Sequence, residues 1–214
     1  MRNIVRLALS TLLMVALAAP AFADSLLNTW GMRAGVGISN LRATNSDFDW
    51  RTAFTGGGFA NLQVLPWLAV QPELLYAQKG ARTSFESTDQ SGNITGSGTI
   101  TFKFDYIEVP VLLALSKPAL GPARAAFLLG PSLGIKVAES VKSEGGGATL
   151  NAKTDVVKTA NFGVVGGLGV RVPVGTLKWV GDARWSYGLT SISKQFYAGD
   201  VQTSSVQITT GVEF

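Results

Sequence analysis

The connections between the predicted strands alternate between short and long, and this alternation constrains the fold more than any other feature of the sequence. Short turns rich in Pro and Gly lie at residues 65–67, 117–122 and 173–176. Longer polar segments separate them, at residues 42–52, 83–98, 139–158 and 191–200. Short turns along one edge of a sheet and long loops along the other are typical of a β-barrel that spans an outer membrane. A soluble sandwich has no physical reason to sort its connections by length.

Eight stretches between these connections have the alternating apolar and polar residues, and the β-branched and aromatic content, of strands. They cover residues 30–41, 53–65, 67–82, 99–115, 123–138, 159–173, 178–190 and 201–214. Soluble sheets usually have strands of about five or six residues, whereas a tilted strand needs about 9–11 residues to cross a bilayer. The length of these stretches favours a membrane barrel.

The alternation of side chains predicts an apolar outer face and a polar inner face. In the last strand one face carries Val206, Ile208, Thr210, Val212 and Phe214, and the other carries Gln207, Thr209, Gly211 and Glu213. Since successive side chains point to opposite sides of a sheet, one face suits lipid and the other a polar interior. A soluble, lipocalin-like barrel is the alternative, and it would have an apolar lumen and a charged exterior.

Hydrogen bonding requires the predicted sheet to close. Each unpaired backbone N–H or C=O group in hydrocarbon costs several kcal/mol, so an open sheet edge cannot face lipid. The last strand is therefore expected to pair with the first, and an even number of strands makes this pairing antiparallel. The predicted fold is an all-β, transmembrane, eight-stranded antiparallel up-and-down barrel over residues 24–214.

The N-terminal segment has the pattern of a signal peptide. Arg2 and Arg6 precede the apolar residues 7–19, and Ala21-Phe22-Ala23 has the small residues of a cleavage site. We expect residues 1–23 to be removed on export to the outer membrane of a Gram-negative bacterium. Without Arg2 and Arg6 the chain has 16 basic and 14 acidic residues. This small excess, with no basic cluster in the sequence, argues against a nucleic-acid partner.

Seven charged residues have the phase of the inner face. They are Arg33, Glu73, Glu108, Lys136, Arg171, Asp182 and Arg184. Side chains nearly fill the lumen of an eight-stranded barrel, and isolated charges there are costly, so we expect these acids and bases to pair. A polar network that plugs the lumen is the preferred interpretation, and an ion or proton path is the alternative.

The fourth predicted strand is irregular. Lys103 and Asp105 share a phase with the apolar Ile107, which indicates either a bulge near Asp105 or charges that lie above the membrane. Pro72 and Pro110 fall inside predicted strands. Because proline has no backbone donor, we expect both to lie outside the barrel or at irregular pairings.

Aromatic residues mark the predicted membrane boundary. Trp30, Trp67 and Trp179 lie at strand ends on the short-turn side, where such rings favour the membrane interface. Ordinary core aromatics are the alternative interpretation. The final Phe214 ends an alternating strand and resembles the C-terminal signal that the barrel-assembly machinery recognises.

Several segments resemble the outer-membrane β-barrel family that includes the PorT-type proteins. Residues 31–37 and the following Ser39-Asn40 are similar to its first strand, residues 68–80 (LAVQPELLYAQKG) to its third and residues 106–110 (YIEVP) to its fourth. Gly130-Pro131 and Tyr187-Gly188-Leu189 resemble its fifth and seventh strands. The resemblance implies a barrel of the OmpA/OmpX shape and implies little about activity, because a fold does not fix a function.

The residue types argue against catalysis. The chain has no histidine and no cysteine, so the usual proton-transfer group at neutral pH and all thiol chemistry are excluded. Ser191 and Lys194 have a Ser-x-x-Lys spacing, but they lie in a predicted loop. We expect neither a cofactor nor a metal site. Loop carboxylates (Asp47 with Asp49, or Glu86 with Asp89) could hold Ca²⁺ only weakly.

We therefore predict a non-enzymatic outer-membrane barrel that presents polar loops outside the cell for support, adhesion or contact with an unidentified partner. Its other expected partners are membrane lipid and the assembly machinery. A narrow porin-like channel is the main alternative, and a lipid-modifying enzyme is disfavoured.

Overall fold

The computed structural model describes residues 27–43, 48–88, 94–145, 148–153, 157–192 and 201–214. The predicted signal peptide lies outside these residues. The described chain forms nine strands: β1 (Leu27–Ala43), β2 (Arg51–Leu65), β3 (Leu68–Thr88), β4 (Ile94–Pro118), β5 (Arg124–Gly145), β6 (Ala148–Lys153), β7 (Ala160–Val174), β8 (Leu177–Gly188) and β9 (Val201–Glu213). No helix among these residues is long and apolar enough to span a membrane.

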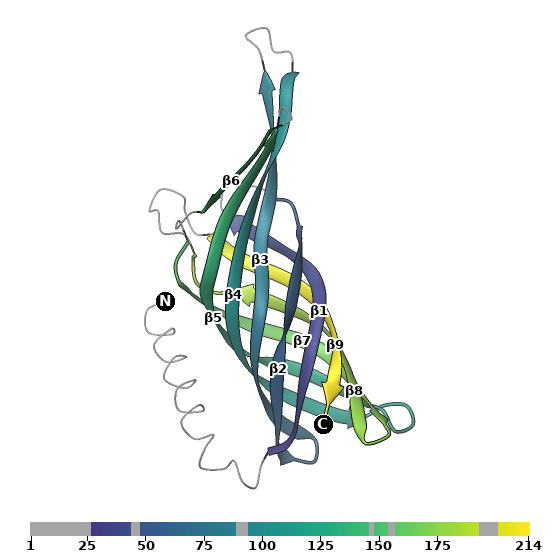
Figure 1. Cartoon of the computed structure of the whole chain (residues 1–214). Helices are drawn as coiled ribbons and strands as arrows, with labels where there is room; N and C mark the ends of the chain where they lie inside the picture. Colours follow the sequence, from purple (N-terminus) through teal and green to yellow (C-terminus); the bar gives the residue numbers. More distant parts are fainter. Residues whose placement is uncertain (1–26, 44–47, 89–93, 146–147, 154–156, 193–200) are drawn as a thin grey trace.

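Eight of the nine strands form a closed ring. Each pairs antiparallel with its neighbours in the order β4-β3-β2-β1-β9-β8-β7-β5, and β4 pairs with β5 to close the ring (Figure 1). The first and last strands are joined over a long register, from Gly31 opposite Glu213 to Ala43 opposite Val201. The predicted eight-stranded antiparallel barrel is confirmed, and the ring has no open edge at the height of this pairing.

The short turns lie where the sequence predicts them. Pro66 and Trp67 join β2 to β3, and the β4–β5 and β7–β8 connections contain Gly121 and Gly175. These two glycines have φ values of 57° and 63°, a left-handed conformation that residues with a Cβ rarely adopt. The start of β1 and the end of β9 lie at this same edge of the barrel, which is the periplasmic edge in outer-membrane barrels (Figure 1).

Two segments predicted as loops, residues 83–98 and 139–158, are largely strand. β3 and β4 stay paired beyond the barrel, with Phe85 opposite Gly98, and β5 forms a hairpin with β6, with Val141 opposite Ala152. The outer parts of β3, β4, β5 and β6 make a sheet, here called the extension, that rises above the ring (Figure 1). The loop prediction was wrong here because backbone pairing continues above the membrane, where polar side chains on both faces meet water.

Side-chain burial gives the barrel an apolar exterior and a charged interior. Large apolar side chains such as Met32, Leu74 and Ile208 are 58–67% exposed on the outer surface. Alternate residues on the same strands, including Arg33 and Glu73, are 5% exposed or less. This is the orientation expected for a barrel surrounded by lipid, and the reverse of a soluble barrel with an apolar lumen.

A β-bulge is present near Asp105, but it lies on the neighbouring strand β5 and not on β4. Asp105 pairs with Ala138 and Tyr106 pairs with Lys136, so Val137 is an extra residue on β5. Lys103 and Asp105 keep the outward phase of Ile107.

The two strand prolines lie at a gap in the hydrogen-bonded ladder. Pro72 is half-buried and has the outward phase of Leu74, whereas Pro110 is buried inside the barrel; both lie at an irregular pairing, as expected. The β3–β4 pairing breaks off at Pro72 opposite Val111 and resumes at Leu75 opposite Glu108. The missing proline N–H groups explain this local irregularity without a change of register.

Candidate functional site in the barrel interior

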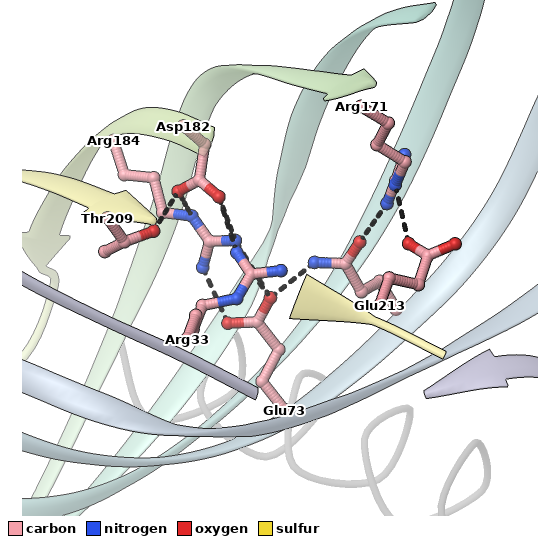
Figure 2. Close-up of polar contacts among 8 residues, drawn as sticks. Arg33, Glu73, Arg171, Asp182, Arg184, Thr209 and Glu213 are labelled. Carbon is pink, nitrogen blue, oxygen red and sulfur yellow. Dashed lines mark hydrogen bonds and ion pairs between the residues drawn. The ribbon is translucent and has the colours of Figure 1, made fainter. Parts of the chain in front are cut away.

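Four charged side chains meet across the centre of the barrel (Figure 2). Arg184 on β8 donates two hydrogen bonds to the Glu73 carboxylate on β3, at 2.6 and 3.0 Å. Arg33 on β1 donates to Asp182 on β8 at 2.6 Å, and its Nη1 lies 3.6 Å from Glu73. Arg184 Nε also lies 2.5 Å from Asp182 Oδ1. We call these four residues the central cluster.

The positions of these residues follow from strand alternation and from the curvature of the ring. Asp182 and Arg184 are two residues apart on β8 and so face inward together. Thr209 on the neighbouring β9 donates to Asp182 at 2.9 Å. Glu73 reaches them from β3, on another part of the wall, so the ion pairs connect strands that are not adjacent in the sheet.

The central cluster contains two positive and two negative charges in a dry environment. All four side chains are at most 4% exposed. Several kcal/mol are needed to remove each ion from water, so such charges persist only when they are paired and hydrogen-bonded. The Arg33 guanidinium also lies 4.1 Å from the centroid of the Phe59 ring, which adds a cation–π contact.

A second set of contacts links the central cluster to the periplasmic end. Gln71 donates to Glu73 at 2.5 Å, and Arg171 donates to Gln71 at 2.6 Å and to Glu213 at 3.0 Å (Figure 2). Glu213 also accepts a hydrogen bond from Lys178, whose side chain is 42% exposed. Arg171 therefore belongs to the same network as the central cluster, through Gln71.

Glu108 and Lys136 lie apart from the central cluster. Glu108 pairs with Lys79 at 2.5 Å, and Lys136 pairs with Glu139. Lys136 also donates to the backbone carbonyl of Val157 at 2.6 Å. The seven predicted charges therefore divide into separate groups in the structure, a division that the sequence does not show.

Three partners in these groups are not among the seven predicted interior charges, although the alternation of the last strand already places Glu213 on its polar face. Lys79 has the phase of Glu73, so the alternation alone identifies it as well. Glu139 is different, because the extra residue Val137 shifts its phase and only the bulge turns it inward.

An apolar cluster lies at the outer mouth of the barrel. Its buried members are Leu41, Ala81, Phe104, Tyr106, Val157 and Ile192, and Phe48, Phe102 and Val201 pack against them. Backbone hydrogen bonds from Lys158 to Ile192 and from Ile192 to Val201 hold the connecting segments against this cluster. We call it the apolar cap. This cluster could not be predicted from the sequence, because Val157 and Ile192 lie in irregular segments.

A small cavity borders the central cluster. A cavity of about 10 Å³ is lined by residues that include Arg33, Gln71, Arg171 and Asp182. This is about the smallest volume that holds one water molecule.

The predicted boundary aromatics lie on the outer surface at the short-turn edge. Trp30, Trp67 and Trp179 are 43–52% exposed, so they are not core residues. The Phe214 ring stacks on Trp30 with 4.6 Å between ring centroids, and the Phe214 N–H donates to the Trp30 carbonyl at 2.7 Å. The chain terminus is thus attached to β1 beyond the end of β9.

Each of the remaining candidate sites includes a residue that the structure does not describe. Asp47, Asp89 and Lys194 lie outside the described residues. Within the part of the chain that the structure describes, no group of three or more acidic side chains could hold a metal ion.

A closed antiparallel ring with apolar side chains outside, paired charges inside and short turns at one edge defines the class of transmembrane β-barrels. A family model for the outer membrane protein beta-barrel domain matches residues 22–194, and the chain belongs to this family. Its location in the outer membrane follows from that membership. The match is to the broad family, so the narrower PorT-type resemblance stays a prediction. A search among curated proteins found no match.

Solved structures with a similar fold include three outer-membrane proteins. One is Ail, the attachment invasion locus protein of Yersinia pestis, solved in complex with the heparin analogue sucrose octasulfate. It is 15% identical to this chain, the match covers 87% of this chain and 98% of that chain, and the TM-score is 0.42. Neisserial surface protein A is 12% identical (86% and 95% covered, TM-score 0.47). OprG from Pseudomonas aeruginosa is 9% identical (88% and 97% covered, TM-score 0.42).

Proposed function

We propose that this protein is a non-enzymatic outer-membrane barrel with a closed lumen, which acts as a rigid support for the extension outside the cell. The observation that carries this proposal is the central cluster, whose two arginines and two carboxylates bind one another across the ring. An ion that crossed the barrel would have to separate these pairs, each of which is desolvated and therefore costly to break.

The apolar cap supports the same proposal from the other end of the lumen. Phe104, Tyr106 and Ile192 are each at most 1% exposed. Apolar side chains that pack without water do not conduct ions, because an ion between them would lose its hydration. A solute would therefore meet two obstacles in series, one apolar and one ionic.

The residue types at these places also support a non-enzymatic role. The interior has no histidine or cysteine, since the chain contains none. Its carboxylates hold arginine and lysine side chains in the fold instead of facing an open cleft. We assign Phe214 to recognition by the assembly machinery, which fits its place at the end of the closing strand.

Planar-bilayer recording tests the closed lumen. Refolded wild-type protein is expected to give no steady conductance steps, whereas a porin inserted in the same bilayers serves as the positive control. Correct folding is checked by heat-modifiable mobility on a gel before each recording. Reproducible steps of one size from protein that passes this check would contradict the proposal and favour the narrow channel.

A further inference from the structure

Three basic side chains lie together on the outward face of the extension, each from a different strand. Arg82 on β3 lies opposite Thr101 on β4, which in turn lies opposite Lys142 on β5. Lys103 follows Thr101 by two residues on β4 and so shares its face. Adjacent strands are about 4.8 Å apart, which brings the three side chains within reach of one ligand group.

All three cations lower the pKa of one neighbouring carboxylate, that of Glu144. Glu144 accepts a hydrogen bond from Lys142 at 2.7 Å, and this contact holds its pKa below the usual value. The charges of Arg82 and Lys103 lower the same pKa further. Glu144 is thus close to all three cations but neutralises only one of them.

The other two cations have no acidic partner among the described residues. Neither Arg82 nor Lys103 forms an ion pair there, and the two hydrogen bonds between Arg82 and Asp49 join backbone groups. Asp105 is the next outward residue after Lys103, yet it makes no ion pair with it. Arg82 and Lys103 therefore remain available to an anionic ligand.

The patch lies just outside the apolar belt of the barrel. On β4 the outward side chains from Leu115 to Ile107 are apolar, and Lys103 lies four residues beyond Ile107. At about 3.3 Å per residue along a strand tilted by about 45°, this is roughly 9 Å above the belt. Lipid headgroups occupy this depth, so the patch faces the headgroup layer of the outer leaflet.

We propose that Arg82, Lys103 and Lys142 bind the phosphate groups of an anionic glycolipid in the outer leaflet. Guanidinium and ammonium groups form charge-assisted hydrogen bonds to phosphate. The next row outward on the same face, Ser84, Thr99 and Glu144, lines a groove of about 350 Å³ together with Glu86. Its hydroxyl and carboxylate groups suit the sugar to which such phosphates are attached.

Native mass spectrometry of protein from nanodiscs tests this binding. The nanodiscs contain zwitterionic phospholipid and a small fraction of lipid A, either phosphorylated or without phosphates. Wild-type protein is expected to retain the phosphorylated form selectively. The triple variant Arg82→Gln/Lys103→Gln/Lys142→Gln is expected to bind it about a hundredfold more weakly, because each basic residue at an anionic surface contributes about a factor of five.

A matched control removes three charges elsewhere on the surface, in Arg42→Gln/Lys117→Gln/Lys158→Gln. This variant should bind like the wild type, and the charge-conserving Arg82→Lys/Lys103→Arg/Lys142→Arg should retain most of the binding. Heat-modifiable mobility checks that every variant is folded. Three results would overturn the proposal: equal retention by the triple Gln variant, an equal loss in the control, or equal binding of phosphate-free lipid A. Retention that free inorganic phosphate abolishes at millimolar concentration would also overturn it, since it would show a site for the soluble ion.

Discussion

The variant Glu73→Gln is expected to lose about 3–5 kcal/mol of unfolding free energy, because it removes one partner from a buried group of charges. In the native barrel the Glu73 carboxylate accepts two hydrogen bonds from Arg184 and lies near Arg33. A neutral amide would leave two guanidinium groups with Asp182 as their only carboxylate. Urea unfolding of protein refolded into lipid vesicles, followed by tryptophan fluorescence and gel mobility, measures the change.

The control for this loss is Glu86→Gln, which neutralises an exposed glutamate on the same strand. It should change the unfolding free energy by no more than about 0.5 kcal/mol. The double variant Glu73→Gln/Arg184→Gln restores equal numbers of positive and negative charges, so its loss should be smaller than the sum of the two single losses. Strictly additive losses, or a Glu73→Gln effect as small as that of Glu86→Gln, would show that the central cluster does not stabilise the barrel.

The variant Ile208→Arg is expected to lose about 2–4 kcal/mol in a bilayer, although Ile208 is one of the more exposed side chains. Ile208 is 67% exposed and lies on the outer surface of β9, where lipid surrounds it in the membrane. A charge placed there must leave water for hydrocarbon. The same unfolding measurement in vesicles gives the difference.

Ile94→Arg is a close control, because Ile94 is also an isoleucine, is 61% exposed and lies at the start of β4 in the extension. There an arginine meets water and should change the stability by no more than about 0.5 kcal/mol. In a soluble barrel the two substitutions would have similarly small effects. Equal costs at the two positions would therefore contradict the membrane orientation.

Which side chains face inward could be predicted from the sequence because the period of a strand is two. The alternation gives the observed inward direction for Arg33, Asp182 and Arg184, because the pairing of β1, β8 and β9 has no bulge near these residues. It failed for Glu139, because Val137 inserts one residue into β5 and reverses the alternation beyond it. A single insertion of this kind leaves no reliable mark in one sequence.

Which charges pair with one another could not be predicted, because pairing depends on the stagger of strands around the ring. Glu73 and Arg184 are 111 residues apart and belong to strands that are not neighbours in the sheet. Their contact follows only when the register of every intervening pair is known. For this reason the prediction grouped Glu108 and Lys136 with the residues of the central cluster, which they do not contact in the structure.

The extension and the apolar cap were missed for two different reasons. The thickness of the membrane sets a minimum strand length but no maximum. The argument from length could therefore not show that β3 continues to Thr88 or that β4 already begins at Ile94. The cap depends on Val157 and Ile192, single apolar residues in segments without periodicity. Only the packing of the outer mouth reveals their role.

The central claim is that the apolar face of the ring contacts lipid and the polar face fills the interior. The chain has no cysteine, so single cysteines can be placed and spin-labelled at each position from Val206 to Thr210 without a background. In vesicles, labels at the even positions should be accessible to oxygen dissolved in the lipid, and labels at the odd positions should be shielded from both oxygen and a water-soluble nickel reagent. Even positions that the nickel reagent reaches as readily as a label at Ile94, or accessibility without alternation, would contradict the claim.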